Sequence, residues 1–162
     1  MGSPVSSDRG PAASQGAIVE QMRRIVRSVQ ALLADSAMGA GLNERDFQAL
    51  VRIVEAAGLS GAELGRILGM TSSSVTELAD RLQNAGMITR TRSPSDRRLV
   101  VLKPTARGKR VIDRALGPTL AAMVTVLDGL ADTELCVVSH FLDQVERQLL
   151  ESRTAASENG RD

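Results

Sequence analysis

Residues 59–108 read LSGAELGRILGMTSSSVTELADRLQNAGMITRTRSPSDRRLVVLKPTARG. Ser60 and Glu63 stand three residues apart near its start, which is the spacing of a capping box that opens a helix. Gly69 ends this short helix, and a second helix is expected over Ser72–Asn84, capped by its first residue or by the threonine before it. Two short helices joined by a tight turn that contains glycine predict a helix-turn-helix.

The hydrophobic pattern changes to that of strands after the second helix. Ile88–Arg92 and Leu99–Lys103 predict two short strands, and the SPSDRR between them is rich in turn-forming residues, with Pro94 and Asp96 placed for a turn. The two strands form a hairpin, or wing, that carries arginines at its tip. We therefore expect a winged helix-turn-helix domain over residues 42–105.

Helices are expected on both sides of this domain. A helical stripe of apolar residues predicts a first helix over Ala17–Asp35, and a second runs from its cap Asn43 to about Ala57. Phe47, Leu50, Val51 and Val54 should face inward from this second helix. The fold class is therefore mainly α.

Two more helices are expected after the wing. Thr105 can cap a helix from Ala106 towards Leu130, and Gly117-Pro118 should kink or split it, because proline lacks an N–H and clashes with the preceding turn. Asp132 can cap a last helix through about Leu150. The ends of the chain, residues 1–15 and 152–162, are poor in apolar residues and are expected to be disordered.

Composition limits the class of protein. Aromatic residues are limited to Phe47 and Phe141, so the core must be aliphatic, which suits packed helices. No apolar run approaches the roughly 20 residues of a membrane span, and the N-terminus does not resemble a signal peptide, so we expect a cytoplasmic protein. Cys136 is the single cysteine, which excludes an intramolecular disulfide and a cysteine-based zinc cluster within one chain.

Charge is distributed unevenly along the chain. The net charge is +1, but Ser60–Arg110 contains ten basic and four acidic residues, so this segment is +6 and the rest of the chain is −5. This asymmetry indicates a polyanionic partner for the middle of the chain, although a solvated charged face explains the charges equally well on their own.

The outward face of the helix over Ser72–Asn84 is the first part of a candidate DNA interface. Its small hydroxyl residues allow close approach, and the free N–H groups at a helix N-terminus favour phosphate. In the wing, Arg90 and Arg92 share one strand face, while Arg97 and Arg98 lie at the far end, where arginine can enter a narrow minor groove. Asp96 is expected to pair with one of these arginines and fix the loop. The candidate DNA-contacting residues are Ser72, Ser73, Ser74, Thr76, Glu77, Asp80, Arg81, Arg90, Arg92, Arg97 and Arg98.

Residues 59–108 resemble the core of the MarR family of multiple-antibiotic-resistance regulators. The resemblance rests on Asp80-Arg81-Leu82, Gly86-Met87-Ile88, Arg90, Asp96-Arg97-Arg98 and Thr105-Ala106-Arg107-Gly108. It implies a homodimeric transcriptional regulator, usually a repressor, in which each winged domain reads half of a palindrome. It also implies that the helix over 72–84 enters the major groove, that Arg98 with Arg97 reaches the minor groove, and that a small-molecule effector can release the DNA.

One residue departs from the family pattern. Pro104 stands where the family usually has an apolar residue, often leucine, and should shorten the second wing strand.

The terminal helices support a dimer independently of the resemblance. Residues 16–40 and 106–151 carry apolar stripes that one small winged domain cannot cover, whereas a second copy can. A monomeric bundle with the same stripes is the alternative.

The sequence offers little support for an enzyme or a metal site. No nucleophile–base pair, phosphate loop or paired carboxylates emerge, so we expect no enzyme, no cofactor and no metal. His140 is expected to be structural or interfacial, and Cys136 an inert buried thiol. The rival functions are a protein-binding winged-helix module without a DNA role and a redox switch through Cys136.

Overall fold

The computed structural model describes residues 14–92 and 99–159 and has the mainly helical, winged-helix fold that the sequence predicts. This part of the chain divides into two compact units, one ending at Ala115 and the other beginning at Leu116. The elements are α1 (Gln15–Gly39), α2 (Glu44–Glu55), β1 (Leu59–Ser60), α3 (Gly61–Leu68), α4 (Ser72–Asn84), β2 (Ile88–Arg92), β3 (Val100–Pro104), α5 (Ala106–Leu127) and α6 (Asp132–Asn159).

A small antiparallel sheet supports the wing. Its strand order is β1-β3-β2, and the hairpin register pairs Ile88 with Pro104 at one end and Arg92 with Val100 at the other. The sequence predicts β2 and β3 but not β1, which is only two residues long and pairs Leu59 with Leu102. A two-residue strand carries too little pattern to be distinguished from the turn before a helix.

Pro104 does not shorten β3, so that expectation is wrong. The Thr105 amide donates to the Met87 carbonyl at 2.9 Å. The adjacent pair, Ile88 and Pro104, is therefore a non-hydrogen-bonded pair of the antiparallel ladder. The nitrogen of Pro104 therefore points away from β2, towards the side of β1. Because β1 pairs only with Val101 and Leu102, no ladder bond is lost to the missing N–H.

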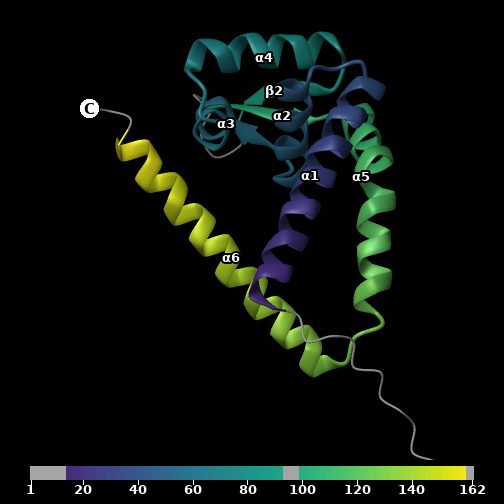
Figure 1. Cartoon of the computed structure of the whole chain (residues 1–162). Coiled ribbons are helices and arrows are strands. Elements are labelled where there is room, and N and C mark those ends of the chain that lie inside the picture. The colour runs from purple at the N-terminus through teal and green to yellow at the C-terminus, as the bar shows by residue number, and fades with distance from the viewer. Residues whose placement is uncertain (1–13, 93–98, 160–162) are drawn as a thin grey trace, which may run out of the picture. The chain divides into compact units, whose positions relative to one another are not determined.

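The core of the first unit lies among α2, α3, α4 and the sheet (Figure 1). The predicted stripe of α4 is fully confirmed, because Val75, Leu78, Ala79 and Leu82 are all buried. The prediction for α2 is confirmed for three of its four inward residues, whereas Val54 is only half-buried. The largest fully buried side chains are Phe47, Leu50, Ile53, Leu64, Leu78, Leu82, Met87 and Ile88.

The helix-turn-helix is fixed by caps at each end of α3. The Ser60 amide and hydroxyl donate to Glu63 Oε2 at 2.8 and 2.6 Å, and the Glu63 amide donates back to Ser60 Oγ at 3.2 Å, which completes the predicted capping box. Gly69 ends α3 with φ of 63°, a left-handed conformation that glycine adopts without strain.

The capping box has a consequence for pH. Hydrogen bonds from the Ser60 hydroxyl and amide lower the pKa of Glu63 below its ordinary value. Because the folded-state pKa is depressed, the cap contributes fully above the carboxyl's ordinary range and is lost as the pH falls through the lowered pKa.

Several helix ends differ from the expectations. α1 begins at Gln15 because Ser14 caps it, accepting from the Ala17 amide at 3.2 Å. α6 extends to Asn159, beyond the expected end at Leu150, and so includes residues assigned from composition to a disordered tail. That segment contains alanine, arginine and glutamate, which are good helix formers and are equally typical of polar tails.

Two expectations about the second pair of helices are wrong. α5 is not split, since it runs unbroken through Pro118. The proline removes one backbone N–H donor from the helix but does not end it. Asp132 is the first residue of α6 and not its cap. The carbonyl of Ala131 accepts from the Leu135 amide at 2.9 Å, and Glu134 Oε2 accepts from the Ala131 amide at 2.8 Å.

The second unit consists of the later part of α5 and all of α6. Between residues 116 and 152, every described side chain is at least partly accessible in the single chain. Cys136 is exposed, so the expectation of a buried thiol is wrong for one copy of the chain. His140 is exposed as well, and its Nε2 lies 2.6 Å from the amide nitrogen of Gln144. Apolar stripes predict which residues share a helix face but not whether the same chain covers that face.

Candidate DNA interface

The outer face of α4 is polar and accessible, as the sequence predicts. Ser72, Ser73, Thr76, Glu77 and Asp80 are all exposed, while the opposite face of the helix is in the core. In Figure 1 α4 lies at the edge of its unit, with α3, α2 and β2 on one side of it. A helix held along one side and free along the other can enter the groove of a duplex.

Hydroxyl groups organise the first turn of α4. Thr71 is the cap, and its Oγ1 accepts from the Ser74 amide at 3.3 Å. The same hydroxyl lies 3.0 Å from Ser74 Oγ and 3.1 Å from Ser73 Oγ. Thr76 Oγ1 donates to the Ser72 carbonyl at 2.9 Å, which settles its χ1 rotamer. The amides of Ser72 and Ser73 have no intrahelical acceptor and can donate to a phosphate.

Arg90 connects the wing to α4. Its guanidinium lies 2.7 Å from Asp80 Oδ1 and donates to Gln83 Oε1 at 2.8 Å. Two of the predicted DNA-contacting residues, Asp80 and Arg90, are therefore paired with each other. The sequence interpretation missed Gln83, which lies one helical turn from Asp80 on α4.

A second arginine of α4 is anchored in the fold. Arg81 Nε and Nη2 donate to the two carboxylate oxygens of Asp46 at 2.8 and 2.7 Å. The Asp46 side chain is 3% exposed and that of Arg81 is 49% exposed. The carboxylate therefore lies in the core, and the arginine extends from it to the surface. The hydrogen bond to Asp46 is the main reason that the pKa of Arg81 is raised above its ordinary value.

The sequence interpretation missed Asp46, although a signal was present. Asp46 stands next to Phe47 and four residues before Leu50, on the apolar side of α2. A buried carboxylate requires partners. Besides Arg81, Asp46 accepts from the Asn43 side-chain amide at 2.9 Å. The pair joins the start of α2 to the last turns of α4 and so sets the orientation of α4.

We expect Arg81→Ala to lower the melting temperature by about 3–10 °C, because it leaves the Asp46 carboxylate buried with one remaining side-chain donor. The matched control is Arg52→Ala, which removes an arginine from an exposed pair with Glu55 at 3.0 Å. Exposed pairs contribute little, so the control should melt within about 2 °C of the wild type. Thermal unfolding followed by circular dichroism measures both, and equal effects would contradict the anchoring role of Asp46.

The junction between the wing and α5 is unusually close. Thr105 Oγ1 donates to the Gly86 carbonyl at 2.7 Å and accepts from the Gly108 amide at 3.0 Å, which confirms Thr105 as the cap of α5. A Cβ atom added at Gly108 would overlap the carbonyl oxygen of Met87. Gly108 is therefore required for α5 to pack against the entry to β2.

Part of the predicted interface falls outside the described residues. Asp96, Arg97 and Arg98 belong to residues 93–98, so the predicted pairing of Asp96 and the position of the two arginines are not tested. Arg92 is exposed at the end of β2, where it forms the last described pair of the ladder with Val100.

Known proteins are similar to this chain in sequence and in fold. The model of the MarR family matches residues 40–99. The chain is 31% identical over 107 residues to YcgE of Bacillus subtilis (strain 168), an HTH-type transcriptional regulator, across 66% of this chain and 70% of that protein. The chain belongs to the MarR family. The transcriptional repressor MprA of Escherichia coli (strain K12) is 30% identical over 122 residues, which cover 74% of this chain and 67% of MprA.

The chain is also similar in fold to a solved structure. The crystal structure of CouR from Rhodococcus jostii RHA1 bound to p-coumaroyl-CoA superimposes with a TM-score of 0.57 at 27% identity, over 84% of this chain and 95% of that chain. The chain is therefore a transcriptional regulator of the MarR type. Regulators of this family are not enzymes.

The part of the chain that the structure describes contains neither a membrane span nor a metal-ligand cluster. No helix in that part of the chain combines the length and the apolar composition that a membrane span requires. Nor do three or more His, Cys, Asp or Glu side chains gather there as metal ligands would.

Proposed function

We propose that the chain is a sequence-specific DNA-binding repressor that acts in the cytoplasm as a homodimer on a palindromic operator. The observation that carries this proposal is α4, a helix buried along one side and exposed along the other, with a hydroxyl-rich first turn. The repressor sign is taken from the relatives, since MprA is described as a transcriptional repressor.

The candidate contacts divide into three groups. Ser72, Ser73, Ser74, Thr76 and Glu77 lie on the first half of α4, where side chains of a recognition helix meet base edges and phosphates. The second group is the arginines of the wing, Arg92, Arg97 and Arg98, which we propose for the minor groove and the phosphates. Arg81, near the end of α4, belongs with them, because the part of its guanidinium that is not bonded to Asp46 can contact DNA. Asp80 and Arg90 contribute as a pair that holds the wing against α4.

The dimer is proposed from apolar side chains that one chain leaves uncovered. On α1, Ile25 and Val26 are 58% and 54% exposed, and on α6 Leu142 and Leu149 are 55% and 62% exposed. The later part of α5 has the same character, with Val126 70% exposed. Apolar faces of this extent mark protein interfaces. We therefore assign the terminal helices, 16–40 and 106–151, to dimerisation and residues 42–105 to DNA binding.

An effector belongs to the proposal as well. The CouR structure is described as bound to p-coumaroyl-CoA. By analogy, a small molecule that changes the spacing of the two α4 helices would weaken binding, because a dimer must place them about one turn of DNA apart.

Salt dependence separates this proposal from a protein-binding winged-helix module. Each phosphate contact releases counterions, so affinity for duplex DNA should fall about a thousandfold or more between roughly 50 and 200 mM salt. Arg92→Ala should reduce the slope of log affinity against log salt by about one per subunit, whereas Arg52→Ala should leave it unchanged. Fluorescence anisotropy with labelled duplex measures the slopes. A protein that binds no DNA at the lowest salt concentration is not a DNA-binding regulator.

A further inference from the structure

The outer face of α4 carries a carboxylate that forms no hydrogen bond or ion pair with a described residue, that of Glu77. Glu77 is exposed, one helical turn after Ser73 and one before Asp80, so it lies in the middle of this face. The proposed function brings the same face against DNA, whose phosphates repel a carboxylate. An unpaired negative charge at this position therefore needs a reason.

The other exposed side chains of this face, apart from the first serine, already have partners. Thr76 Oγ1 donates to a backbone carbonyl one turn earlier at 2.9 Å, and Ser73 Oγ lies 3.1 Å from the hydroxyl of the capping threonine. Asp80 Oδ1 lies 2.7 Å from the Arg90 guanidinium, which neutralises its charge. Glu77 is therefore the longest side chain of this face that remains available for a ligand.

A structural role beside Arg81 does not account for Glu77. The two residues are four positions apart, but Arg81 directs Nε and Nη2 to Asp46, at 2.8 and 2.7 Å. The hydrogen bond to Asp46 is the main cause of the raised pKa of Arg81, and the charge of Glu77 is the smallest of the causes. Arg81 is thus held by the core carboxylate, and Glu77 is not needed to hold it.

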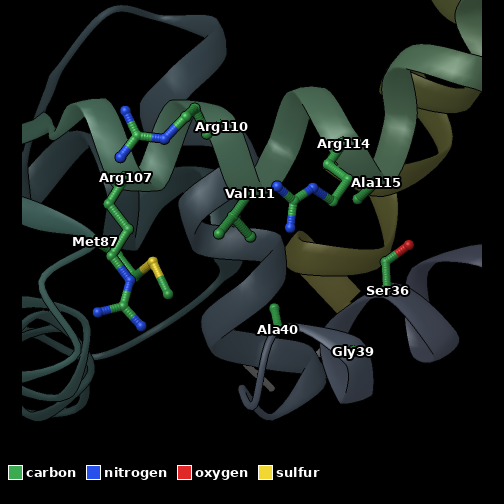
Figure 2. A pocket seen from close by; sticks show the side chains of 9 residues that line it. All are labelled: Ser36, Gly39, Ala40, Met87, Arg107, Arg110, Val111, Arg114 and Ala115. Atoms are coloured by element: carbon green, nitrogen blue, oxygen red, sulfur yellow. The ribbon is translucent and has the colours of Figure 1, made fainter.

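Some arginines of the first unit also lack a carboxylate partner among the described residues. Arg107, Arg110 and Arg114 of α5 line a cavity beside the end of α1 (Figure 2), and none of them forms an ion pair with a described carboxylate. Glu77 does not line that cavity. These arginines are therefore not its counterion, and its carboxylate stays open to a ligand.

The major groove offers few groups that a carboxylate can bind. An ionised carboxylate only accepts hydrogen bonds, and the donors on the base edges there are the N4 amino group of cytosine and the N6 amino group of adenine. The N6 group lies between two acceptors, N7 of adenine and O4 of the paired thymine. The N4 group has an acceptor on one side only, O6 of the paired guanine. Cytosine is therefore the base that repels a carboxylate least and can donate to it.

We propose that Glu77 is a specificity-determining residue that reads one cytosine in each half-site by accepting a hydrogen bond from its N4 amino group. The inference rests on the proposed function and goes beyond it by naming a base. The charge lowers affinity for duplexes in general, because phosphates and most base edges repel it. The loss is smaller where cytosine donates to it, and this difference is the specificity.

The test is selection of bound duplexes from a random-sequence pool by the full chain, by Glu77→Gln and by Glu77→Ala. The wild type should select a cytosine at one position of each half-site. Glu77→Gln should select adenine there, because a glutamine amide pairs with both N6 and N7 of adenine. Glu77→Ala should show no preference at that position and should keep the rest of the motif.

Anisotropy titrations of the selected duplex measure the effect. Replacing the cytosine by thymine in both half-sites should weaken wild-type binding about tenfold or more, and that of Glu77→Ala by less than about threefold. Glu55→Gln is the matched control, since it removes the same charge from an exposed glutamate of α2. It should select the wild-type motif and show the wild-type loss.

Three outcomes would overturn the inference. In the first, both Glu77 variants, shown by circular dichroism to be folded, select the wild-type motif, even if their affinity for all duplexes changes equally. In the second, the wild type selects a motif in which Glu77→Gln and Glu77→Ala alter a position that is not a cytosine. Both leave the proposed function standing. In the third, the wild type selects no motif, and the proposed function fails as well.

Discussion

Gly108→Ala is expected to destabilise the protein by about 2–4 kcal/mol, which lowers the melting temperature of a chain of this size by roughly 5–15 °C. The added methyl group would overlap the Met87 carbonyl oxygen and lie 3.1 Å from its carbon and 3.3 Å from Leu50 Cδ1. The Met87 carbonyl cannot move away cheaply, since it accepts from the Thr105 amide at 2.9 Å and shares with the Gly86 carbonyl the hydroxyl proton of Thr105. The start of α5 would have to separate from the winged domain.

The matched control for this variant lies in the same helix. Gly117 has no atom within 4 Å of an added Cβ, so Gly117→Ala should be neutral or stabilise the helix by up to about 1 kcal/mol. Calorimetric melting of both variants measures the difference. If Gly108→Ala melts within about 2 °C of the wild type, the close packing of α5 against β2 is not what the structure indicates.

Arg98→Ala is expected to cause the largest loss of DNA affinity. The loss should be about 1–3 kcal/mol for each half-site, and therefore roughly 30-fold or more for a dimer. Arg92 and Val100 form the last described pair between β2 and β3, and Arg98 lies between these two strands in the sequence. We propose Arg98 for the minor groove because arginine is the side chain best suited to a narrow groove.

The Arg98 variant must be compared at equal oligomeric state. Light scattering should show the same mass for Arg98→Ala and the wild type, because the proposed dimer helices lie outside the wing. Arg52→Ala serves as the control for loss of a positive charge at an exposed position. If Arg98→Ala binds DNA within about threefold of the wild type, the wing does not contribute as proposed.

The sequence predicted those elements whose signals are local. α4 was predicted with its bounds and its buried stripe, because Val75, Leu78 and Leu82 act within one helix. Its cap, Thr71, was one of the two candidates that the sequence offered. The Ser60–Glu63 capping box and the turn at Gly69 are local for the same reason. β2 and β3 were recognisable because turn-forming residues separate two runs of strand-forming residues.

What the sequence did not predict depends on contacts between distant segments. Asp46 and Arg81 are separated by 35 positions, and no periodicity links them. The pairing of Arg90 with Asp80 likewise depends on how the wing packs against α4. These two ion pairs change the interpretation of the site, because two arginines assigned to DNA from their position on a surface also hold the recognition helix and the wing in place.

The central claim is that two copies of the chain read a palindrome through α4. It is tested most directly by selecting bound duplexes from a random-sequence pool at about 150 mM salt, where non-specific binding is weak. We expect enrichment of an inverted repeat whose half-site centres lie about 10–11 base pairs apart, or a multiple of that distance. Recovery of no common sequence by the folded protein, or of a motif without two-fold symmetry, would contradict it.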